Sequence, residues 1–377
     1  MNKIDYPLTR KGRTDFESAY YKALTKTNEA LINSSLSTFL FNGIPLNFET
    51  LVKLSFEELV NLSPRLIRHS NTFNKIITVK KKKVITNAFL DLFNYTGNQP
   101  KLANFFMNQK SLKIKSCCYC SIDYINSFVD FPDYASALEF INQADEYELQ
   151  YIKDLKEPLA KKIIARRTVK KFLSVDDIPA DKKIKNLIKR IPFENSHNHF
   201  TLDHLIPQKT HKFYSLCLYN LAPSCYACNA KFKNSIEFTI DKDLIFISPT
   251  SSNYSFLTDF EFKIRFSLSL DKISNTSDFL LTKNVRGNEK HVEKYLRMFK
   301  ILGRYFNHKD QILKLIEKNK NYPNSKIKEL SIDTGIPQIE IRKMIFGEDL
   351  YNREYDGYPL VKFRRDIARD IKIKGVL

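Results

Sequence analysis

The sequence predicts an α+β protein in which two mostly helical regions flank a central segment that carries the candidate chemistry. Apolar residues recur at three- and four-residue spacing from Asp15 to about Leu92, which is typical of helices packed on a core. All six cysteines and four of the seven histidines fall between residues 95 and 245. Apolar residues alternate at 260–266, which predicts a strand, and the helical pattern returns from Glu289.

These patterns divide the 377 residues into three expected parts. Residues 1–94 form a mostly helical N-terminal region, and residues 95–245 form the central module. Inside that module, residues from about 130 to 195 indicate an inserted helical segment with turns at Pro158 and Pro179. Residues 246–377 form a mixed and then helical C-terminal region, in which 327–346 fit the spacing of a helix-turn-helix.

The net charge indicates a polyanionic partner. Lysine and arginine number 61 against 42 aspartates and glutamates, a net charge of +19, which favours nucleic acid first and an anionic membrane surface second. No run reaches the roughly 18 apolar residues of a membrane span, and the first residues lack the apolar run of a secretory signal. Six cysteines are too few for a disulfide scaffold in a chain of this length. We therefore expect a cytoplasmic protein with reduced thiols and no membrane-spanning segment. The site residues described below then favour nucleic acid over a membrane as the partner.

The charge is distributed in blocks. Residues 51–116 carry twelve basic and three acidic residues, residues 117–160 carry two and nine, and residues 161–240 carry fifteen and six. The run Lys80–Lys83 either contacts phosphate or is simply a solvated face. The basic stripe that includes Arg166 and Arg167 leaves the same two alternatives open.

Two Cys-x-x-Cys pairs predict a metal site. Cys117 with Cys120 and Cys225 with Cys228 offer four thiolates on two tight turns, which suits a closed tetrahedral zinc site; buried or redox-active thiols are the alternative. The two remaining cysteines, at positions 118 and 217, are expected to be small buried apolar side chains.

A second group of residues suits phosphodiester hydrolysis. His204 is a candidate general base because the ordinary pKa of histidine lies near neutrality. Asp203 and Asn229 offer oxygen ligands that suit Mg²⁺ or Mn²⁺, with positions left for water and phosphate. Asn220 is a candidate to hydrogen-bond the backbone or the imidazole and so orient the base.

The order Asp203-His204-x-x-Pro207, then Asn220-Leu-x-Pro-x-Cys225-x-x-Cys228-Asn229, resembles the HNH (ββα-metal) endonucleases. The resemblance implies a β-hairpin followed by a helix, pinned by a structural zinc. It also implies that Asp203 and Asn229 hold the catalytic metal, that His204 is the general base, and that Asn220 braces the hairpin. It closely covers residues 200–233 and adds the distant cysteine pair at 117–120.

Further residues are candidates for nucleic-acid contact. A helix after Cys225 would place Lys233 on the same face as Asn229, where it either contacts phosphate or is merely exposed. In the possible helix-turn-helix, the second helix would present Arg342 and Lys343 outward while Met344 packs below.

The expected function is therefore metal-dependent cleavage of DNA, which is favoured over RNA because members of this family mostly cut DNA. Resemblance to bacterial stand-alone members with helical flanks suggests restriction or anti-phage defence. The alternatives are a zinc-stabilised nucleic-acid-binding protein without activity, and an RNA-cutting or indiscriminate nuclease. A partner protein, such as an ATPase, and a homo-oligomer both stay open.

Overall fold

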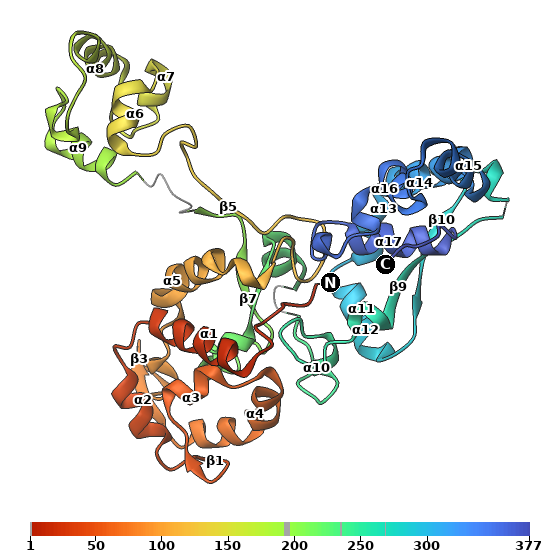
Figure 1. Ribbon diagram of the computed structural model, residues 1–377. Coiled ribbons are helices and arrows are strands. Elements are labelled where there is room, and N and C mark those ends of the chain that lie inside the picture. The colour runs from red at the N-terminus through yellow and green to blue at the C-terminus, as the bar shows by residue number, and fades with distance from the viewer. Residues whose placement is uncertain (1, 192–196, 234–235, 268) are drawn as a thin grey trace. The chain divides into compact units, whose positions relative to one another are not determined.

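The computed structural model describes residues 2–191, 197–233, 236–267 and 269–377, and the chain divides into two compact units (Figure 1). Unit 1 comprises Met1–Ile125 and Phe200–Leu377, and unit 2 comprises Asn126–His199. The expected inserted segment lies inside unit 2. The flanking sequence on both sides of it contributes to one unit.

The N-terminal part of unit 1 is mainly helical, as the apolar spacing predicts. The start of α4 is fixed by a capping box in which Glu58 N–H donates to Ser55 Oγ and Ser55 N–H donates to the Glu58 carboxylate. Its buried residues recur every three or four positions, for example Leu59, Leu62 and Leu66. The helices are α1 (Arg10–Ala23), α2 (Glu29–Leu36), α3 (Phe48–Lys53), α4 (Phe56–Asn71) and α5 (Tyr95–Asn108).

Residues 74–87 form strands that were not anticipated within a region expected to be mostly helical up to about Leu92. β3 (Asn74–Val79) pairs antiparallel with β4 (Lys82–Asn87) across a two-residue loop. β-branched Ile, Val and Thr side chains in both strands favour extended backbone, which explains the change. A smaller hairpin pairs β1 (Leu40–Phe41) with β2 (Ile44–Pro45).

A third hairpin lies where the site residues were predicted. β7 (Thr201–His204) pairs antiparallel with β8 (Leu221–Ser224), and η6 (Ala227–Lys233), a π-helical segment, follows. The connection between the strands contains the short helices η4 (Lys212–Tyr214) and η5 (Leu218–Asn220). A hairpin followed by a helical segment is therefore present at residues 201–233.

The C-terminal part of unit 1 contains the strand predicted at 260–266 and the helices predicted after Glu289. β9 (Phe260–Arg265) pairs antiparallel with β10 (Leu280–Val285). The helices of this part are α10 (Leu244–Ile247), α11 (Phe256–Asp259), α12 (Glu289–Met298), α13 (Ile301–Phe306), α14 (Lys309–Asn321), α15 (Asn324–Thr334), α16 (Gln338–Phe346) and α17 (Val361–Asp370).

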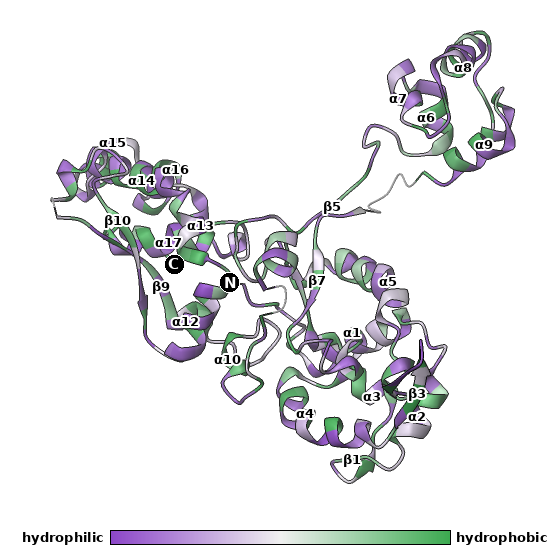
Figure 2. Ribbon diagram, turned by 180° about the vertical axis from the view of Figure 1, so that it is seen from behind, coloured by the Kyte–Doolittle hydropathy of each residue, from purple (hydrophilic) through white to green (hydrophobic). Residues whose placement is uncertain are grey.

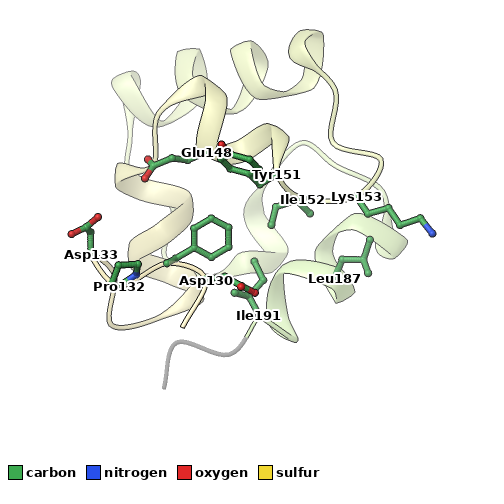
Figure 3. Close-up of a pocket in the computed structure, with 10 residues that line it drawn as sticks. Asp130, Pro132, Asp133, Glu148, Tyr151, Ile152, Lys153, Leu187 and Ile191 are labelled. Carbon is green, nitrogen blue, oxygen red and sulfur yellow. The ribbon is translucent and has the colours of Figure 1, made fainter. Parts of the chain in front are cut away.

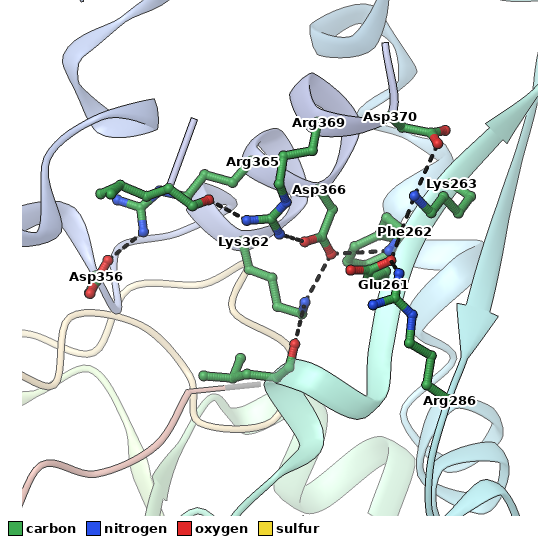
Figure 4. Close-up of polar contacts among 12 residues, drawn as sticks. Glu261, Phe262, Lys263, Arg286, Asp356, Lys362, Arg365, Asp366, Arg369 and Asp370 are labelled. Carbon is green, nitrogen blue, oxygen red and sulfur yellow. Dashed lines mark hydrogen bonds and ion pairs between the residues drawn. The ribbon is translucent and has the colours of Figure 1, made fainter. Parts of the chain in front are cut away.

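Carboxylates of α17 satisfy backbone groups along β9. Asp366 accepts a hydrogen bond from Phe262 N–H at 3.0 Å, and Lys362 and Arg369 of the same helix neutralise it (Figure 4). Asp370 accepts from the N–H of Ile264 at 2.9 Å. Because unpaired N–H groups on a strand attract other strands, these bonds both tie α17 to the sheet and protect its edge.

Unit 2 is a small helical body with its own apolar core. Its helices are α6 (Ala137–Gln143), α7 (Glu146–Gln150), α8 (Glu157–Val169) and α9 (Lys182–Lys189). In α9 the buried Ile184 and Ile188 alternate with lysines, which gives the helix its mixed hydropathy (Figure 2). The strands β5 (Ser127–Phe128) and β6 (His197–Asn198) pair where the chain enters and leaves.

A cavity of about 550 Å³ opens in unit 2 (Figure 3). It combines apolar side chains such as Ile152 and Leu187 with the acidic side chains of Asp130, Asp133 and Glu148. No helix among the described residues is both long and apolar enough to span a membrane.

Candidate functional site

The β7–β8 hairpin and η6 bring together residues that are far apart in sequence. Thr201 and Asp203 are two positions apart on β7, so their side chains lie on the same face of the strand. Asn229 Nδ2 donates to Thr201 Oγ1 at 3.0 Å, and Lys233 Nζ donates to Asp203 Oδ2 at 2.6 Å. This face of β7 is therefore covered by η6, and Asn229 and Asp203 lie on the same side of the hairpin.

Asp203 is a buried carboxylate with two partners. Its Oδ2 accepts from the ammonium of Lys233 and from the hydroxyl of Tyr119. Lys233 Nζ also donates to the carbonyl of His204 at 2.5 Å. Asp203 and Lys233 are each 5% exposed, so Lys233 neutralises Asp203 inside the protein. Lys233 therefore neither contacts a phosphate nor lies exposed, which were the two expected alternatives.

His204 is held in one orientation by its surroundings. Its Nε2 lies 3.0 Å from the carbonyl oxygen of Ser215, and its ring packs edge-on against Tyr95 at 4.5 Å between centroids. A carbonyl can only accept, so Nε2 carries the hydrogen and Nδ1 of the neutral ring keeps its lone pair. Burial lowers the pKa of His204 below its ordinary value, against the opposing effects of the Ser215 carbonyl and Asp203. The imidazole is therefore neutral near pH 7 and can accept a proton at Nδ1.

Asn220 braces the loop that orients His204. Its Oδ1 accepts from Ile206 N–H at 2.7 Å, and its Nδ2 donates to the carbonyls of Ile206 and Tyr214 at 3.0 and 3.1 Å. The carbonyl of Ser215, the next residue, is the one that holds the imidazole. Asn220 thus bonds the backbone, the first of its two expected roles, and acts on His204 through one intervening peptide.

The four cysteines of the two predicted pairs meet in one buried cluster. The sulfur atoms of Cys117, Cys120, Cys225 and Cys228 all lie within 4.8 Å of one another, and those of Cys120 and Cys225 are 3.9 Å apart. A tetrahedral ion with bonds of about 2.3 Å to sulfur separates its ligands by about 3.8 Å, so the cluster can hold a metal such as zinc. The chain leaves after the first pair, forms unit 2, and returns to complete the cluster.

Contacts within the cysteine cluster favour a thiolate at Cys120, whereas hydrogen bonds with other cluster cysteines raise the pKa of Cys225 and Cys228. Hydrogen bonds from the neighbouring thiols lower the pKa of Cys120, and the guanidinium of Arg304 on α13 adds to this effect. Arg304 donates to the sulfurs of Cys228 and Cys120 at 3.0 and 3.3 Å and also pairs with Asp123 at 3.1 Å. Four thiolates around a divalent ion carry two negative charges, and Arg304 offsets one of them.

Sequence reasoning missed three contributors to the site. Tyr119 lies between the first two cluster cysteines, so its hydroxyl connects the cysteine cluster to Asp203. Its position inside the first Cys-x-x-Cys pair was the available signal. Tyr95 and Arg304 gave no signal, because nothing in a single sequence indicates that α5 and α13 reach the site. The two remaining cysteines, at positions 118 and 217, are buried as expected.

The basic residues of unit 2 have different environments. Arg166 on α8 is exposed, and its predicted contact with nucleic acid stays a prediction. Arg167 donates to the backbone carbonyls of Ile141 and Ala144, so it holds the carboxyl end of α6. Its guanidinium therefore has a structural role within unit 2.

The predicted helix-turn-helix forms a helical hairpin, α15 and α16, that turns at Gly335, where φ is 70°. Its outward face differs from the expected one. Arg342 is 6% exposed and donates to the side chain of Asn324, whereas Met344 is 72% exposed. Lys343 pairs with an acidic neighbour on the same helix at 2.8 Å. The face is rotated relative to the prediction, so Arg342 points inward and cannot read bases from this position.

Comparison of the chain with protein-family models, with curated proteins and with solved structures finds no match. The functional assignment therefore depends on the sequence motif and on the geometry of the site.

Proposed function

We propose that this chain is a metal-dependent endonuclease of the HNH type that hydrolyses phosphodiester bonds in DNA. The observation that supports it most is the environment of His204. The imidazole is neutral, its Nε2–H is held by a carbonyl, and its sequence neighbour is a carboxylate on the face covered by Asn229. This combination suits a general base better than it suits an ordinary packed histidine.

In this proposal His204 Nδ1 takes the proton of the attacking water. The hydrogen bond from Nε2–H to Ser215 keeps the ring in the correct tautomer and strengthens as the imidazolium forms, because the carbonyl then accepts from a charged donor. Asp203, next in sequence, lies near the developing positive charge. Asn220 keeps the Ser215 carbonyl in place by holding the adjacent peptide.

Asp203 and Asn229 would hold Mg²⁺ or Mn²⁺ through carboxylate and amide oxygens, which are the ligands that such hard cations prefer. The ammonium of Lys233 already lies against Oδ2 of Asp203, so the ion would have to displace it or bind through Oδ1. When bound, the ion would polarise the scissile phosphate and stabilise the leaving oxygen. We infer zinc for the cysteine cluster, where it would join the residues that precede unit 2 in the sequence to those that follow it.

The proposal is tested by incubating the purified chain with plasmid DNA, single-stranded DNA and RNA, each with Mg²⁺, with Mn²⁺ and with EDTA. We expect cleavage of DNA with either metal, loss of cleavage in EDTA, and recovery when Mg²⁺ is restored in excess. Binding without cleavage under every condition would instead indicate a zinc-stabilised binding protein. Cleavage of RNA alone would contradict the substrate assignment.

A further inference from the structure

The β3–β4 hairpin is an exposed, strongly basic ribbon. Residues 74–87 contain five lysines and no acidic residue. Every residue of β3 is exposed, as are the first four residues of β4. The exposed apolar side chains lie on both faces, with Ile76 opposite Ile85 on one and Ile77 opposite Val84 on the other. An isolated two-stranded hairpin is only marginally stable in water, so a ribbon of this kind gains from packing against a partner.

The tip of the ribbon has an unusual sequence for its geometry. Lys80 and Lys81 both have positive φ, 46° and 63°, as a two-residue type I′ loop requires. Asn-Gly is the favoured sequence there, and the β1–β2 hairpin of this chain uses it, with Asn42 at 50° and Gly43 at 79°. A side chain in this left-handed region is disfavoured, because its Cβ lies too close to the following carbonyl oxygen. The two lysines at the tip therefore lower the local stability of the hairpin. A role in binding explains why they occupy these positions.

The base of the ribbon is fixed to unit 1. Phe73 and Phe89 flank the strands and contact each other at 5.5 Å between ring centroids, with Phe89 buried. Asn87 donates to the carbonyl of Ser70 at the end of α4. The same helix contacts the connection between β7 and β8, because Ser63 Oγ and His211 Nε2 lie 2.6 Å apart. The ribbon is thus held by α4, the helix that also contacts the connection following His204.

We propose that the β3–β4 ribbon binds a groove of double-stranded DNA, with the lysines at its tip contacting phosphates. This inference rests on the proposed function for its ligand class. A two-stranded ribbon fits the major groove, which is about 12 Å wide. The charge is complementary to the phosphates, and the apolar side chains on both faces can contact base edges and thymine methyl groups.

The experiment replaces the tip by the turn that the chain already uses. Lys80→Asn with Lys81→Gly removes two charges and gives the loop its favoured sequence, so the hairpin is retained. Lys11→Gln with Lys22→Gln removes two charges from the exposed face of α1 and serves as the matched control. Binding to a duplex oligonucleotide is measured by fluorescence anisotropy without added divalent metal, so that cleavage does not interfere.

If both lysines contact phosphates, the slope of log Kd against log salt concentration falls by about 2 in the tip variant. The affinity lost between 50 and 200 mM salt is then about tenfold smaller than in the parent. The control keeps the parental slope.

Equal slopes in the tip variant and the parent would overturn the inference. So would tip-dependent binding to vesicles of phosphatidylcholine and phosphatidylserine together with unchanged binding to DNA, since the ribbon would then recognise a membrane. The readout is binding and not cleavage. If the parent does not cleave DNA but the tip variant shows the smaller slope, the proposed function is wrong and the ribbon still binds DNA. If the parent cleaves DNA but the two slopes are equal, the proposed function stands and the inference about the ribbon is wrong.

Discussion

Replacing Lys233 by methionine tests the electrostatics of the site most sharply. The substitution keeps much of the side-chain volume but removes the ammonium, which leaves the Asp203 carboxylate buried with the hydroxyl of Tyr119 as its remaining hydrogen-bond donor. Removing one partner of a buried ion pair typically costs about 3–5 kcal/mol. Because Tyr119 still donates to Asp203, we expect the lower end, about 3 kcal/mol.

Urea unfolding followed by circular dichroism measures this loss. The double variant Asp203→Asn with Lys233→Met has no uncompensated charge, so its destabilisation should be well below the sum of the two single variants. Millimolar Mg²⁺ should stabilise Lys233→Met more than the parent, because the ion can take the place of the missing ammonium beside Asp203. Unchanged stability of Lys233→Met, or single-variant losses that simply add, would refute the buried pair.

Three further predictions concern the supports of the site. Asn220→Ala leaves buried backbone groups unpaired, so stability should fall by about 3 kcal/mol and cleavage by roughly 100-fold, with duplex binding retained; unchanged cleavage would contradict its positioning role. Cys225→Ser should release the bound zinc and lower Tm, measured by elemental analysis and thermal unfolding, whereas the control Cys118→Ser should keep one equivalent; zinc retained in both would refute the cluster. Burial lowers the pKa of His211 to about 4, below the unfolded value of about 6.5, so the unfolded chain binds the proton more tightly. The stabilisation that neutral His211 gives the folded state is complete above about pH 6.5 and falls by up to about 3 kcal/mol towards pH 4. His211→Gln should therefore flatten the dependence of the unfolding free energy on pH across that window.

The sequence allowed prediction of those parts of the site whose residues follow one another closely. The family resemblance carried by Asp203, His204, Asn220 and Asn229 implied a hairpin and a helical segment. Two Cys-x-x-Cys pairs predicted the cysteine cluster, although more than a hundred residues separate them. The strand at 260–266 and the helices after Glu289 were also correctly predicted, since both follow from simple apolar periodicity.

The remaining features depend on tertiary contacts that periodicity does not encode. Lys233 lies on the predicted side of Asn229, but the neighbouring carboxylate of Asp203 draws it inward. Arg342 turns inward because Asn324, at the start of the preceding helix, accepts its hydrogen bond. The ribbon at 74–87 was missed because its two strands are short and follow directly on a strongly periodic helix.

Plasmid cleavage by His204→Ala in Mg²⁺ tests most directly whether His204 is the general base of a nuclease. His199→Ala removes an exposed histidine nearby in sequence and is the matched control. We expect His204→Ala to keep its zinc, its fold and its duplex affinity while cleavage is lost, and His199→Ala to cut like the parent. Cleavage by His204→Ala at the parental rate would contradict the assignment.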